Sequence, residues 1–151
     1  KAWVEAVGEV VEDCFKGEVK RITSAPRRVD EAIARAKRAS NNSCQVTGAK
    51  KKRGKTFQLH GHHLFDKVSR PDLADFIDNI LVVEGSIHLD FHSWNKGKEI
   101  CTPKDFLDYL SEARGDLFDS ENSRTLERHR KLVARLVSLQ SNYEGNHLKY
   151  N

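Results

Sequence analysis

Cysteine is scarce in this chain of 151 residues. Cys14, Cys44 and Cys101 are odd in number and form no CxxC motif, so the sequence encodes neither a disulfide framework nor a four-cysteine zinc ribbon. We therefore expect reduced thiols. Methionine is absent altogether, and because the chain begins with Lys1 we expect its natural start to be missing or altered.

Long apolar runs are also missing. No stretch approaches the roughly 20 apolar residues that a membrane-spanning helix needs, and the N-terminus lacks the apolar core and cleavage site of a signal peptide. We therefore expect a cytoplasmic protein with no membrane partner. The length predicts one domain with extensions. A content of 32% charged and 38% hydrophobic residues is typical of a folded, well-solvated chain.

Positive charge is in modest excess, with a net charge of +4 and a pI near 9.0, but its distribution is uneven. Basic residues cluster in RRVDEAIARAKR, AKKKRGK and LERHRKLVAR. The first and third clusters fit a solvated helix face as well as a binding surface. The second is a glycine-bounded loop, and such loops commonly contact phosphate. The nucleic-acid contacts that we expect are Lys50, Lys51, Lys52, Arg53, Lys55, Lys96 and Lys98.

Hydrophobic periodicity predicts helices toward both ends of the chain. A further helix should begin after Thr102, because Thr102, Pro103 and Asp105 match the cap, the first position and the third position of a helix N-terminus. The last ten residues, 142–151, have the composition of a tail. The periodic helices are predicted over residues 2–19, 30–39 and 123–139.

The middle of the chain alternates β-rich runs with turn formers. The runs at 44–46 and 56–64 predict a β-hairpin that carries the basic loop at its tip. The apolar run at 79–85 predicts a short strand or bend. Residues 86–97 then predict a helix with Ser86 as its N-cap. The chain as a whole is predicted to be an α+β protein.

Five of the seven histidines lie in one segment, residues 60–92, that runs from the hairpin into this helix. Residues four apart share a helix face, so His88 and His92 can direct their rings at one centre. Neighbours on a strand face opposite ways, so only one of His62 and His63 can join them while the other faces a substrate. Three imidazoles around a cation leave positions for water or phosphate, as in catalytic sites. His60 either supports this site from outside the ligand set or is merely exposed.

Residues 44–110 resemble the HNH, or ββα-metal, nucleases. The matching residues are the pair His62 and His63 at the end of the hairpin, Asn79 in the following loop, and the HxxxH of His88 and His92. The segment is similar to small phage and homing endonucleases and, in its Asn-to-His spacing, to colicin-type DNases. The resemblance implies a ββα-metal core over 44–110. A helical extension over 1–43 and a helical extension with a tail over 111–151 would flank it.

The same resemblance implies a role for each matching residue. His62, His88 and His92 would bind one divalent ion (Mg²⁺, Mn²⁺ or Zn²⁺), His63 would be the catalytic general base, and Asn79 would brace the loop. An unmetallated imidazole suits a base at neutral pH, and a cation can stabilise the charge that develops on the phosphate. The chain lacks the paired cysteines of a supporting zinc ribbon, so we expect Cys44 in the core.

The function implied by the resemblance is metal-dependent hydrolysis of double-stranded DNA by an HNH endonuclease that nicks or cuts both strands, in a homing or phage-type role. Cutting both strands with one site per chain would favour a homodimer. One alternative is a non-catalytic DNA-binding module in which zinc is structural and His63 is incidental. A second alternative is a toxin-type DNase or RNase.

Overall fold

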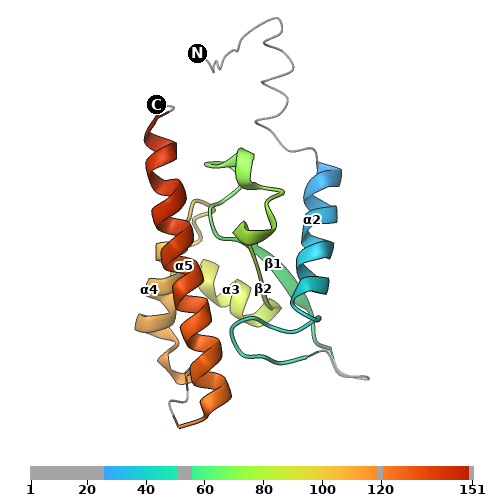
Figure 1. Ribbon diagram of the computed structural model, residues 1–151, viewed down its shortest axis with the longest axis vertical. Helices are drawn as coiled ribbons and strands as arrows, with labels where there is room; N and C mark the ends of the chain where they lie inside the picture. Colours follow the sequence, from blue (N-terminus) through green and yellow to red (C-terminus); the bar gives the residue numbers. More distant parts are fainter. Residues whose placement is uncertain (1–25, 51–55, 119–120, 150–151) are drawn as a thin grey trace, which may run out of the picture.

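The computed structural model describes residues 26–50, 56–118 and 121–149, with side chains up to residue 144 (Figure 1). In this part of the chain, no helix is both long and apolar enough to cross a membrane. The described residues form an α+β fold, with a two-stranded antiparallel hairpin and four α-helices. The elements are α2 (Pro26–Ala39), β1 (Leu59–His63), β2 (Ile80–Glu84), α3 (Gly85–Trp94), α4 (Pro103–Ala113) and α5 (Ser123–Lys149), with short 3-10 helices at Pro71–Leu73, Ile77–Asn79 and Gly115–Leu117.

The strand partner of β1 differs from the prediction. β1 pairs with β2, in a register that sets His62 opposite Leu81 and His63 opposite Ile80, so the hairpin predicted between 44–46 and 56–64 is wrong. The β2 segment is the stronger strand former because its first four residues are apolar and buried. Residues 44–46 instead form a turn along β2, where the backbone N–H of Gln45 donates to the carbonyl of Val82 at 2.8 Å.

The helix boundaries follow local chemistry in some places and tertiary packing in others. The capping box of α4 is confirmed, since the Thr102 hydroxyl accepts from the backbone N–H of Asp105 and the Asp105 carboxylate accepts from that of Thr102. The prediction of Ser86 as an N-cap is wrong. α3 begins at Gly85, so Ser86 lies inside the helix, and the N-cap residue is Glu84, whose side chain makes no capping hydrogen bond. α5 continues to Lys149, so the tail predicted from 142 is helical up to that residue. The predicted helix at 2–19 lies outside the described residues.

Both faces of the hairpin are covered, and this fixes where the histidines point. Ile80 and Val82 pack on Ala32 and Ala36 of α2, whereas Leu81 and Val83 join the main core with residues of α3, α4 and α5. Figure 1 shows α2 on one side of the hairpin and α4 and α5 on the other. Gly61 allows the close approach of α2, because a Cβ there would lie 2.9 Å from the Ile33 side chain.

The main core runs from the turn before β1 to the C-terminal helix. It includes Cys44, which is buried as predicted, and an aromatic cluster made by Phe91, Phe106 and Tyr109. Leu132, Leu136 and Leu139 of α5 pack in the same core, so the segment predicted as a C-terminal extension helps to hold the hairpin and α3 together. The order β1, β2, α3 is compatible with a ββα arrangement.

Candidate metal centre

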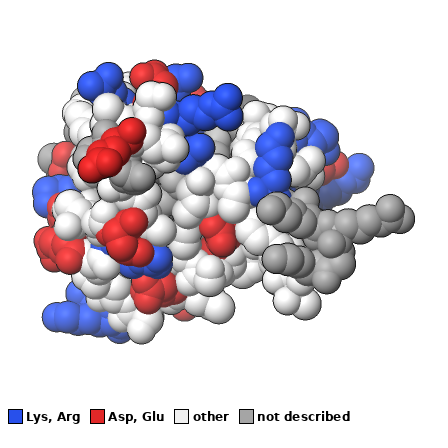
Figure 2. All heavy atoms as spheres, turned by 90° about the horizontal axis from the view of Figure 1, so that it is seen from below, with Lys and Arg blue, Asp and Glu red and all other residues white. Residues whose placement is uncertain are grey.

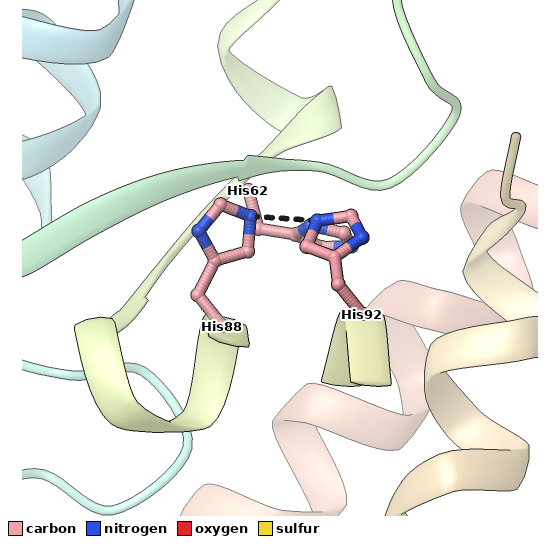
Figure 3. A group of neighbouring side chains, drawn as sticks. All are labelled: His62, His88 and His92. Atoms are coloured by element: carbon pink, nitrogen blue, oxygen red, sulfur yellow. Dashed lines mark hydrogen bonds between the residues drawn. The ribbon is translucent and has the colours of Figure 1, made fainter. Parts of the chain in front are cut away.

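Three histidines from two elements meet at one point beside the hairpin (Figure 3). His62 comes from the end of β1, and His88 and His92 come from successive turns of α3. One ring nitrogen from each lies within 4.8 Å of the other two, and the Nε2 atoms of His88 and His92 are 3.0 Å apart. Nitrogens that ligate one zinc ion at about 2.0–2.1 Å lie about 3.3 Å apart. The three rings are therefore close enough to hold a metal ion.

His62 is buried, and one of its ring nitrogens makes no hydrogen bond within the described residues. Its side chain is 1% exposed and packs against the rings of Phe91 and Phe106. Its buried Nε2 atom has no hydrogen-bond partner within the described part of the chain, which is rare for buried polar atoms. Burial, followed by the proximity of His88 and His92, lowers the pKa of His62 well below 6.5. The neutral ring has a free lone pair for a metal.

His88 has the same preference for the neutral form. Burial, followed by the neighbouring His92 and His60, lowers the pKa of His88 to about 4. Neutral imidazole is the form that binds divalent ions, so at neutral pH neither His88 nor His62 has to lose a proton first. An all-imidazole donor set suits zinc and other transition metals better than magnesium, which prefers oxygen ligands.

His60 lies against the outer side of this cluster. Its Nδ1 atom is 3.0 Å from Nδ1 of His88, while Nε2 of His88 faces His92. Gly85 makes room for this ring, because a Cβ there would lie 3.0 Å from Nε2 of His60. If His88 binds metal through Nε2, its Nδ1–H can donate to His60, a contact that orients the ligand ring. Of the two alternatives for His60, this placement favours support of the site.

We predict that His60→Ala weakens metal binding by roughly 10- to 100-fold, as the loss of a hydrogen bond to a ligating histidine commonly does. His60→Asn, which keeps a side-chain acceptor, should recover part of the affinity. Calorimetric titration of metal-stripped protein with Zn²⁺ measures both variants. Equal affinity in the parent and in His60→Ala would show that His60 is a bystander.

His63 is not part of the cluster of three, and it has a different partner. Its Nε2 atom lies 2.8 Å from the carbonyl oxygen of Ala74. A carbonyl can only accept, so Nε2 carries the proton and Nδ1 of the neutral ring keeps a lone pair. Burial lowers the pKa of His63 from 6.5, although the bond to Ala74 opposes the shift. The ring is thus held in a form that can take up a proton at neutral pH.

One cavity of about 230 Å³ connects His63 with the cluster of His62, His88 and His92. Two carboxylate residues, Asp66 and Glu99, also line this cavity. Both oxygens of Asp66 accept backbone N–H bonds, from Cys101 at 3.0 Å and Ser69 at 2.8 Å, so this side chain is committed to the fold. Glu99 is exposed. The remaining lining residues are Gly61, Lys67, Val68 and Cys101.

Asn79 braces the segment that connects β1 with β2. It is fully buried, its Oδ1 accepts from the N–H of Phe65 at 2.8 Å, and its Nδ2 donates to the carbonyls of Phe65 and Leu73 at 3.0 and 3.2 Å. These bonds agree with the bracing role implied by the resemblance. Asn79 does not line the cavity, so it is a positioning residue and has no place among the groups that would touch a substrate.

The cations predicted to contact nucleic acid are only partly described. Lys50, Lys96 and Lys98 are exposed, and none of them lines the metal cavity. Residues 51–55 lie outside the described part of the chain. Lys67 does line the cavity, and sequence analysis missed it because it stands alone, outside every basic cluster.

Comparisons of the chain with protein-family models, with curated proteins and with solved structures find no match.

Proposed function

We propose that this protein is a metal-dependent endonuclease of the HNH type that hydrolyses phosphodiester bonds of double-stranded DNA. One observation carries the proposal: a single cavity holds a cluster of three imidazoles and, separately, an imidazole with a free nitrogen. Phosphodiester hydrolysis needs both parts. A base must take a proton from the attacking water, and a positive centre must stabilise the charge on phosphate and leaving oxygen.

Five of the residues that line the cavity have a place in this reaction. A divalent ion bound by His62, His88 and His92 would supply the Lewis acid for the phosphate and the leaving 3′ oxygen. His63 accepts the proton of the water through Nδ1 as the water oxygen bonds to phosphorus and the bond to the 3′ oxygen breaks. Lys67, on the wall of the cavity, attracts the phosphate.

The alternative of a structural zinc site accounts for less of the geometry. Structural zinc is almost always held by four protein ligands, whereas three ligating residues gather here among the described residues. It also gives no reason for a fourth histidine held in a defined tautomer in the same cavity. A homing or phage-type role, a homodimer and the choice among Mg²⁺, Mn²⁺ and Zn²⁺ are further parts of the proposal.

The experiment that tests the function is incubation of metal-stripped protein with supercoiled plasmid and a series of divalent ions. We expect nicked and then linear DNA with at least one ion, and intact plasmid in excess chelator. A parallel RNA substrate tests the RNase alternative. If no ion supports cleavage although the protein binds both metal and DNA, the binding module is correct and the nuclease proposal is wrong.

A further inference from the structure

A second cavity, of about 410 Å³, lies between α5 and the turn that precedes β1. It shares no lining residue with the metal cavity. Three of its lining residues are cations on α5, namely Arg128, Lys131 and Arg135, and none is Asp or Glu. Their spacing of three and four residues sets them on one helix face. Three positive charges thus face a cavity whose described lining residues include no carboxylate.

Arg135 is fixed by the fold. Its guanidinium donates to the carbonyls of Ile80 at 2.8 Å and Asp78 at 3.0 Å, and to the side-chain oxygen of Gln45 at 3.1 Å. Burial lowers the pKa of this guanidinium, and the nearby Asp78 opposes the shift. Neutral acceptors spread its charge but do not cancel it, so Arg135 adds a fixed positive field to the cavity.

The Arg128 guanidinium lies against the turn on the opposite wall. Gly48 has φ +79°, and a Cβ there would clash with the guanidinium of Arg128. Because glycine has no Cβ, it can adopt this left-handed backbone conformation and also leaves space for the guanidinium. Arg128 and Lys131 form no ion pair with a described carboxylate. Both charges remain available to a ligand.

We propose that this basic pocket binds a backbone phosphate of duplex DNA, as a contact additional to those at the metal centre. Guanidinium groups bind phosphate in a bidentate manner, and an ammonium adds a point charge. The turn at the pocket continues to Lys50, whose backbone forms an isolated antiparallel β-bridge with Ser43. In the sequence, Lys50 is followed directly by the rest of the basic cluster AKKKRGK. Figure 2 shows Lys and Arg side chains on several parts of the face seen from below, among them its upper edge and its right side, and these add positive charge for an extended polyanion. The choice of DNA rests on the proposed function.

The test compares single variants of α5 in the full chain. Arg128→Ala and Lys131→Ala each remove one pocket cation, while Arg130→Ala removes an exposed cation from the same helix outside the pocket. Arg135 stays intact because its bonds hold the fold. Anisotropy of a labelled DNA duplex, measured with a chelator to prevent cleavage, gives affinity against salt concentration. We expect each pocket variant, but not Arg130→Ala, to reduce the slope of log affinity against log salt by about 0.9.

Other arms of the experiment identify the source of the phosphate. Equal slopes in Arg128→Ala, Lys131→Ala and Arg130→Ala would overturn the pocket, even if the protein cleaves plasmid. Calorimetric binding of inorganic phosphate without duplex binding, or a slope change with RNA alone, would overturn DNA as the ligand. Reduced slopes in a protein that never cleaves DNA would support the pocket and overturn only the nuclease function.

Discussion

His63→Ala is expected to slow DNA cleavage by roughly 100- to 10,000-fold, the usual contribution of a general base. Among the described residues, only His63 combines a place in the metal cavity with a ring nitrogen fixed by a backbone carbonyl, 2.8 Å away at Ala74. The variant should keep its fold, its affinity for metal and its affinity for DNA. Cleavage of supercoiled plasmid under single-turnover conditions, together with circular dichroism and calorimetry, separates these effects.

Glu99→Gln is the matched control. Glu99 also lines the cavity and can also accept a proton, but unlike His63 its side chain is exposed. This variant should cleave close to the parental rate. The parental rate should fall at acid pH, since a protonated imidazole cannot accept a proton. Burial holds the pKa of His63 below 6.5, so this fall belongs below that pH and should disappear in His63→Ala. If Glu99→Gln loses activity and His63→Ala retains it, the assignment of the base is reversed.

The pairing of His88 with His92 was predictable from short-range geometry, whereas the choice of His62 as the third ligand came from the resemblance to HNH nucleases. The four-residue spacing of His88 and His92 and the alternation of His62 and His63 survive whatever partner the strand has. The capping box at Thr102 is equally local, and the structure contains it. The strand partner was not predictable in the same way. Residues 44–46 and 80–83 are both β-prone, and burial between α2 and the main core selects the second.

The supporting contacts depend on tertiary structure and leave little trace in the sequence. The contact of His60 with His88 joins residues 28 positions apart. The basic pocket needs α5 to lie against the turn at Gly48, and the amphipathic pattern of α5 does not specify that neighbour. The one available signal was the basic cluster LERHRKLVAR, which fits a solvated helix face as well as a binding surface.

The metal centre itself should bind one divalent ion per chain. His88→Ala and His92→Ala should each weaken binding by more than the 10- to 100-fold expected on removal of a supporting contact, because a direct ligand is lost. In His88→Ala, His92 would be the one remaining histidine of the cluster that could bind an ion together with the buried Nε2 of His62. Calorimetric titration of metal-stripped protein gives the stoichiometry and the affinities.

The order of the losses distinguishes a metal site from a cluster of stacked rings. If the ion is held by His62, His88 and His92, affinity must fall further in His88→Ala and His92→Ala than in His60→Ala, which leaves all three ligands in place. Metal should also stabilise the parent against heat, by about 2.7 kcal/mol when the free ion is at 100 times its dissociation constant. A stoichiometry of zero, or parental affinity in both ligand variants, would mean that no ion is held here. His63 would then have no Lewis acid beside it, and the proposed hydrolysis would fail with it.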